Sequence, residues 1–202
     1  MKRNDIFFTR GRIRPLLHAE SLSARDNALL AQQMKDRSFD PSAVQAVARR
    51  CSKGFPSVVR CAPFKGGMPF PTSFWLTCPY LVRLCGERES EGAVGILENA
   101  MKNNAREWTV FHLHAARMRI LDLPPSQAKF LCRYRKRTWR SLARGGAGGI
   151  EYRRRGGGAK CLHLQVAYWL ALGVHPARAV LERMMYPLEC DVPSKWGCIH
   201  PL

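Results

Sequence analysis

The chain has 202 residues and a mass of 22.9 kDa, and 33 Lys and Arg against 15 Asp and Glu give it a formal net charge of +18. This length favours one domain, and a hydrophobic content of 46% excludes a disordered chain. The longest apolar stretch, residues 162–174, is interrupted by His163, Gln165 and Gly173 and is too short to span a membrane. Because the first residues also lack the apolar segment of a secretory signal, we expect a cytoplasmic protein.

In the first half of the chain, residues 1–19 are predicted to form a basic arm, followed by a helix over 22–36. Asp40 and Pro41 are a cap and first-turn signal, which predicts a second helix to about Arg50. Residues 51–56 have turn chemistry, and Val58 and Val59 indicate a short strand. Three prolines and two glycines exclude a regular helix over 62–73.

The second half reads as a series of helices. Pro79, preceded by a Thr77 or Cys78 cap, predicts a helix to about Glu89. Further helices are expected over 91–104, 106–121, 125–143, 159–172 and 176–186, with a loop over 145–158 and an irregular segment over 190–202. We therefore predict a mostly α fold: a compact multi-helix single domain with a Gly/Pro-rich loop region and one small β hairpin. A basic arm and helix (1–44) would precede the cysteine-containing α-rich domain (45–202).

The positive charge is concentrated in two segments, with a net +8 in residues 1–65 and +9 in residues 133–160. Clustered cations attract polyanions, so RNA or the ribosome is the expected partner, and a solubility surface or an acidic protein partner is the alternative. Trp139 lies within the second segment, where it can stack on a base or pack with Leu131 and Leu142. The candidate nucleic-acid-binding residues are Arg133, Arg135, Lys136, Arg137, Arg140, Arg153, Arg154, Arg155 and Lys160.

Eight cysteines in a chain without an export signal argue against a disulfide framework, and no C-x-x-C pair is present. Cys78 and Cys161 each stand where a helix is predicted to begin, where unpaired N–H groups favour the thiolate. Cys51 opens a Gly/Pro turn that can bend around a ligand. Each is a candidate metal ligand or nucleophile, and the alternative for each is a small buried hydrophobe.

Three sequence blocks carry a family resemblance. They are VARRCSKGFP at residues 47–56, GMPFPT followed by WLTCPYL at 67–81, and GAGGI followed by KCLH at 146–163. Together they resemble a bacterial domain-of-unknown-function family, number 501, over roughly residues 45–198. The resemblance implies a shared set of cysteines at Cys51, Cys78, Cys161, and Cys198 or Cys190. It implies no activity.

A set of four dispersed cysteines fits a tetrahedral zinc site or an iron–sulfur cluster equally well by count. His163 is an additional candidate ligand, whereas Gln165 and Tyr168 stand where the family usually has histidines. Cys61, Cys85 and Cys132 have no counterpart in the pattern and are expected to be core or surface residues.

An enzyme that uses the cluster or a cysteine thiolate on a small-molecule or nucleic-acid substrate is a second hypothesis. His163 would be its base, but two residues after Cys161 on a helix it should face away, and it would have to serve Cys51 or Cys78. Glu87, Glu89 and Glu91 indicate an exposed face, and the glycines of 145–149 could cradle a phosphate. A cell-division or envelope-associated interaction protein is a third, family-level hypothesis.

Overall fold

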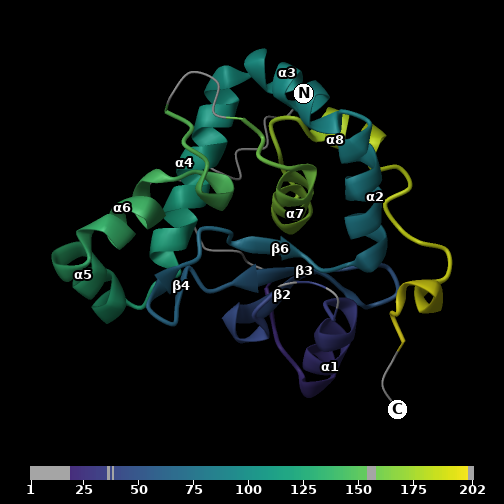
Figure 1. Cartoon of the computed structure of the whole chain (residues 1–202), viewed down its shortest axis with the longest axis horizontal. Coiled ribbons are helices and arrows are strands. Elements are labelled where there is room, and N and C mark those ends of the chain that lie inside the picture. Colours follow the sequence, from purple (N-terminus) through teal and green to yellow (C-terminus); the bar gives the residue numbers. More distant parts are fainter. Residues whose placement is uncertain (1–18, 36, 38, 154–157, 200–202) are drawn as a thin grey trace.

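The computed structural model describes residues 19–35, 37, 39–153 and 158–199 (Figure 1). The predicted arm, apart from its last residue, and the candidates Arg154 and Arg155 lie outside the described residues. The elements in chain order are β1 (Glu20–Ser21), α1 (Ala24–Gln33), η1 (Pro41–Ala43), β2 (Val44–Arg50), β3 (Pro56–Cys61), β4 (Phe64–Lys65), β5 (Met68–Pro69), β6 (Phe74–Leu76), α2 (Pro79–Ser90), α3 (Ala93–Lys102), α4 (Ala105–Leu121), α5 (Pro125–Tyr134), α6 (Lys136–Arg144), η2 (Ala147–Gly149), α7 (Leu162–Leu172), α8 (Arg178–Met184) and η3 (Pro193–Trp196).

The mostly α single-domain prediction is confirmed, with a sheet larger than the one hairpin expected. In the described part of the chain, four antiparallel strands pair in the order β1-β2-β3-β6, and β4 and β5 form a separate two-stranded hairpin. Helices cover both faces of the sheet, with α7 on one side and α1 on the other (Figure 1).

Helix α7 forms the centre of the fold. It is apolar on nearly every side, and such a helix is stable only when it is buried. It packs on β6 and β3 and is flanked by α2 and α4 (Figure 1). Its one buried amide, Gln165, donates to the Ala159 carbonyl at 2.6 Å and accepts from His175 Nε2 at 3.0 Å. The apolar stretch at 162–174 is therefore a core helix.

Helix α1 begins with a capping box, in which Ser23 and Asp26 each accept a backbone hydrogen bond from the other residue. It buries Leu29 and Leu30 at the sheet. Asp26 Oδ1 also accepts a hydrogen bond from Arg50 Nη1 at 2.7 Å, and this ion pair joins the start of α1 to β2.

The helix predicted over 41–50 is wrong. The capping signal is real, because the Asp40 side chain accepts from the Ser42 N–H at 2.9 Å, but it starts only the single 3₁₀ turn of η1. The chain then continues as β2, which pairs with β3 over its whole length and with β1. Pairing with distant strands, which local propensity cannot register, overrides the helical tendency of this segment.

The helix predicted over 125–143 is instead two helices, α5 and α6, separated at Arg135, which has φ −124° and ψ 55°. We call residues 125–144 the α5–α6 hairpin. The reversal lets Leu142 and Trp139 pack in one cluster with Leu131 and Leu123. Of the two roles considered for Trp139, stacking on a base and packing within the protein, the structure shows packing.

The glycine-rich segment after α6 is packed against α4. Arg119, which is fully buried, donates to the carbonyls of Leu142, Pro71 and Gly146, and also to that of Gly145. A Cβ at Gly146 would lie 2.3 Å from His112 Nδ1, so only glycine allows this approach. The N–H groups of 146, 147, 149 and 150 all donate within the fold, which leaves none of these four for a phosphate.

Candidate metal centre

Four thiols from separate parts of the chain line one cavity of about 220 Å³. Cys51 lies in the turn between β2 and β3, and Cys78 is the residue on which α2 begins. Cys190 and Cys198 lie in the segment after α8, on either side of η3. The residues that line the cavity thus come from the β2–β3 turn, the start of α2 and the segment after α8.

A carboxylate holds Cys190 near Cys51. Glu189 accepts from the backbone N–H of Ser52 at 2.9 Å and also from its hydroxyl. Because Ser52 follows Cys51 and Glu189 precedes Cys190, this contact joins the two segments that carry the thiols. The Cys51 turn is itself closed by Cys51 N–H to the Phe55 carbonyl at 3.0 Å.

Aromatic contacts hold the segment after α8 against the start of α2. The Tyr80 hydroxyl donates to the Pro187 carbonyl at 2.8 Å, and the Tyr80 and Trp196 rings meet edge to face with centroids 5.2 Å apart. Cys198 is buried in a cluster with Leu29 and Phe55, against which Cys51 also packs. Gln33 Nε2 donates to Cys198 Sγ at 3.3 Å.

The thiols influence one another's protonation. Burial raises the pKa of Cys78 to about 12, the neighbouring Cys198 and Cys190 add to the rise, and the N–H groups of the first turn of α2 oppose it. Burial also raises the pKa of Cys190 and of Cys198, and in each case the Cys51 thiol contributes. Without a cation the thiols of Cys78, Cys190 and Cys198 stay protonated, and a bound metal would displace their protons.

The donor set fits a metal centre by its chemistry. Four soft sulfur donors suit zinc or iron–sulfur clusters. A single tetrahedral zinc ion with bonds of about 2.3 Å places its sulfurs about 3.8 Å apart. Among the described residues, however, no three of these four sulfurs lie within 4.8 Å of one another. The four sulfurs therefore do not stand in the arrangement that a single tetrahedral ion requires.

The structure places Cys161 elsewhere. It precedes α7, and its sulfur lies within 4.8 Å of a Glu89 carboxylate oxygen and of a His163 ring nitrogen. Glu89 is at the opposite end of α2 from Cys78, and eleven steps along the helix, at 1.5 Å each, separate them by about 16 Å. Cys51, Cys78 and Cys198 are thus brought together with Cys190, and Cys161 is grouped with His163.

The expectation that His163 faces away from Cys161 is wrong. It assumed that both residues are helical, but α7 begins only at Leu162 and Cys161 is extended, with φ −159° and ψ 158°. The extended residue lets both side chains turn toward Glu89. Glu89 itself, predicted to lie on an exposed face, is half-buried between α2 and α7.

The remaining cysteines fit the core-or-surface expectation, since Cys61 and Cys85 are buried, Cys132 is exposed, and all eight cysteines are free. Three functional candidates escaped the sequence reasoning: Gln33, Glu89 and Glu189. Each acts through a partner more than 70 residues away, so no local pattern signals it.

The candidate nucleic-acid-binding residues that the structure describes fall in two places. Arg133, Arg135, Lys136, Arg137 and Arg140 are exposed on the α5–α6 hairpin. Arg153 and Lys160 are exposed on either side of the segment outside the described residues, and Lys160 Nζ donates to the Gly148 carbonyl at 2.9 Å. No helix in the described part of the chain has the length and apolarity to cross a membrane.

Comparison with known proteins identifies a family. The sequence profile of DUF501, described as a protein of unknown function, matches residues 47–182, which include Cys51, Cys78 and Cys161. No curated protein and no solved structure matches this chain significantly. The profile covers two thirds of the sequence and the same motif blocks that carry the resemblance, and the chain therefore belongs to the DUF501 family.

Proposed function

We propose that this protein holds an iron–sulfur cluster on Cys51, Cys78, Cys190 and Cys198. The observation that carries the proposal is the convergence of four free thiols, drawn from four separate places in the sequence, on one cavity. Buried cysteines scattered through a core as small hydrophobes have no reason to surround the same space.

The spacing and surroundings favour a cluster over a single zinc ion. Among the described residues no three of these sulfurs lie within 4.8 Å of one another, whereas one tetrahedral ion holds all four about 3.8 Å apart and a polynuclear cluster holds its cysteines further apart. Cys78 is followed by proline, as in many cluster-binding sequences. The Gln33 amide donates to Cys198, which is the kind of hydrogen bond that tunes a cluster's potential. Arg49 and Lys53 also line the cavity and would offset the negative charge of the thiolates.

Anaerobic purification of the full chain tests the proposal, with iron, sulfide and zinc measured alongside the absorption spectrum. We expect bound iron and sulfide and a broad band near about 400 nm. Single Cys→Ser changes at 51, 78, 190 and 198 should each reduce the band, whereas Cys132→Ser, an exposed thiol on α5, should leave it unchanged. A colourless protein that loses one zinc ion in the same four variants would replace the cluster with a zinc centre. A metal-free protein of undiminished stability would overturn both.

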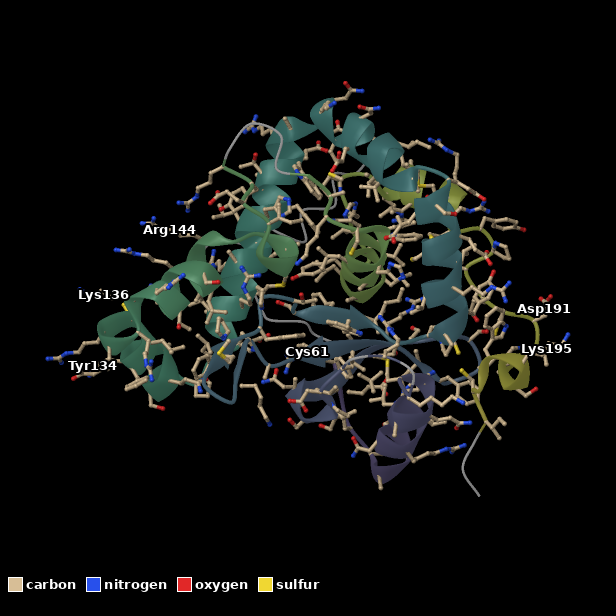
Figure 2. All side chains as sticks on the ribbon, in the orientation of Figure 1. Cys61, Tyr134, Lys136, Arg144, Asp191 and Lys195 are labelled. Carbon is tan, nitrogen blue, oxygen red and sulfur yellow. The ribbon has the colours of Figure 1, made fainter. Side chains whose placement is uncertain are left out.

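We also propose that the α5–α6 hairpin binds RNA. The hairpin carries Lys129, Arg133, Arg135, Lys136, Arg137, Arg140 and Arg144 and no Asp or Glu. All of the described ion pairs lie elsewhere in the chain, so these cations keep their full field. Figure 2 shows Tyr134, Lys136 and Arg144 extending away from the body of the molecule.

An exposed aromatic pair accompanies these cations. Phe130 and Tyr134 are both largely exposed, with ring centroids 5.6 Å apart, and the Arg133 guanidinium lies 5.4 Å from the centre of the Tyr134 ring. Aromatic faces among unpaired cations are what single-stranded RNA uses for stacking and phosphate contacts. An acidic protein partner would use the charges but would gain nothing from the rings.

A labelled single-stranded RNA titrated at several salt concentrations tests this second proposal. The variant with Lys136, Arg137 and Arg140 changed to Ala should flatten the slope of log K against log salt by about 2, because each lost phosphate contact removes about 0.7. A triple Ala variant at the exposed Arg25, Lys102 and Arg106 is the charge-matched control, and it should leave the slope of log K against log salt unchanged. Tyr134→Ala should weaken binding roughly tenfold without changing the slope. Equal affinity for polyglutamate, or equal effects of both triple variants, would overturn RNA recognition by the hairpin.

A further inference from the structure

The strongest remaining feature is the group of Glu89, Cys161 and His163, where the end of α2 meets the start of α7. We propose that these three residues form a second metal site, separate from the thiol cavity, that takes one divalent cation of the zinc type and leaves one coordination position open. It does not rest on the proposed cluster.

The three donor atoms already stand close to the geometry of a bound ion. A thiol sulfur, a carboxylate oxygen and an imidazole nitrogen all lie within 4.8 Å of one another. Around tetrahedral zinc, with bonds of about 2.0–2.3 Å, such atoms are about 3.3–3.7 Å apart. The Glu89 oxygen and His163 Nδ1, at 3.0 Å, are near this separation, so only a small shift would close the site.

The hydrogen bonds around the site orient these donors. The N–H of Leu162 donates to Glu89 Oε1 at 2.5 Å, which fixes the carboxylate against the start of α7. His163 Nε2 lies 3.1 Å from the Val82 carbonyl, which can only accept, so the contact is a hydrogen bond in the ring tautomer that has its proton on Nε2. Metal-binding histidines commonly donate their second ring nitrogen to a backbone carbonyl in this way.

That arrangement directs the other ring nitrogen, Nδ1, at the Glu89 carboxylate, with 3.0 Å between Nδ1 and Oε1. A cation at this point would be bound by the imidazole, the carboxylate and the Cys161 sulfur together.

The backbone and the exposure support a site. Lys160, directly before Cys161, has φ +69°, a left-handed conformation that non-glycine residues rarely adopt and that often marks functional sites. Its side chain is anchored on the Gly148 carbonyl. Glu89 and His163 each keep 27% of their side-chain surface exposed, so water or a substrate oxygen can reach a fourth position. Three mixed protein ligands with an open position are typical of catalytic rather than structural zinc.

Zinc and cobalt titrations of the full anaerobic chain, with native mass spectrometry to count ions, test the proposal. Cys161→Ser and His163→Ala should each lose one ion and weaken zinc binding at this site by more than about a hundredfold. With Co²⁺, the sulfur-to-cobalt absorption of this site should disappear in Cys161→Ser and remain in the matched control Cys132→Ser. Cys78→Ser should affect only the ions of the thiol cavity, so the two proposals can fail independently.

Glu89→Gln is a second variant that keeps an acceptor for the Leu162 N–H. The melting temperature of this variant should stay within a few degrees of that of the wild type. Its affinity for zinc should nevertheless be lower than that of the wild type. If wild type, Cys161→Ser, His163→Ala and Glu89→Gln all retain the same number of ions with the same affinity, the group is an ion pair between α2 and α7 and the proposal is overturned.

Discussion

Positive charge has opposite surroundings in two regions of the molecule, the α5–α6 hairpin and the body centred on α7, by which we mean the described residues outside 125–144. In the body, Arg119 is fully buried and its guanidinium is surrounded by backbone carbonyls, and Arg50 is bound by Asp26 and Glu20. On the hairpin, seven cations are exposed and no carboxylate lies in the same segment. Charge contributes to stability in the body, whereas on the hairpin it is left available to a partner and works against folding.

Replacing Arg119 should have the largest effect on the stability of the body. Arg119→Met would remove the guanidinium donors from the carbonyls of Leu142 and Pro71 and one of the two donors from that of Gly146, and we expect a loss of about 3–5 kcal/mol in the free energy of unfolding. Arg106→Met on the exposed side of the same helix is the control and should change it by less than about 0.5 kcal/mol. Urea denaturation measures both, and equal losses would contradict the role assigned to Arg119.

The buried histidines of the body predict an acid-sensitive core. Burial lowers the pKa of His112 to about 4 and of His175 to about 3, with Arg119 and His112 respectively adding to the effect. In the unfolded chain each histidine takes up a proton near pH 6.5. The unfolded state therefore binds more protons below this pH, and stability falls as the pH is lowered from 6.5 toward 4.

The expected loss is about 2 kcal/mol for each histidine at pH 5. The hydrogen bonds explain why the native state resists protonation, because Nδ1 of His112 accepts from the Ala147 N–H and Nδ1 of His175 accepts from the Ala177 N–H. His175→Gln should flatten the curve of unfolding free energy against pH between 6.5 and 5. An unchanged curve would show that His175 is protonated in the folded protein.

Asp26 should make stability depend on pH in a separate range, below that of the histidines. The Arg50 guanidinium holds the pKa of the Asp26 carboxyl well below its usual range, and the Ser23 N–H and hydroxyl lower it further against the effect of burial. Its stabilising contribution is therefore complete above about pH 5 and is lost as the pH falls below about 4. Asp26→Asn should cost about 1–2 kcal/mol at pH 7 and less at pH 3. A cost that does not change with pH would assign the effect to the cap alone.

The success of the sequence analysis depended on whether the deciding contact was local. The Pro79 start of α2 follows from signals within a few residues, whereas the sequence left the role of Trp139 open and the α5–α6 reversal decides it. The β2 strand does not follow from such signals, because its partner strands decide its conformation and Asp40 shows only that some turn begins there. The break at Arg135 likewise reflects the burial of Leu142, which the helical periodicity of 125–143 conceals.

The same distinction holds for the candidate site. The resemblance selected Cys51, Cys78 and a late cysteine, but the contact that sets Cys190 beside Cys51 runs from Glu189 to Ser52, 137 residues apart. Cys161 was grouped with the others because the KCLH block of the same resemblance contains it and because, like Cys78, it stands where a helix begins. The two helix starts are alike in sequence, and only the packing of α2 against α7 shows that Cys161 lies near Glu89.

The smallest expected effect tests the hairpin side of the comparison. Lys136, Arg140 and Arg144 follow one another at four-residue intervals on α6, so each neighbouring pair repels by about 0.2–0.5 kcal/mol. Arg140→Gln removes both repulsions and should raise the free energy of unfolding by about 0.5 kcal/mol at low salt, and the gain should vanish in 1 M salt, where the Debye length is about 3 Å. The matched control is Arg178→Gln on α8, where Arg178 Nε pairs with Glu182 at 2.6 Å; there the same substitution should lower stability by about 0.3 kcal/mol at low salt. Opposite signs from one chemical change on two exposed helices would establish that the hairpin keeps its cations at a cost to folding. A loss of stability in both variants would mean that the hairpin charges are compensated within the fold, and the case for a polyanionic partner would lose its electrostatic basis.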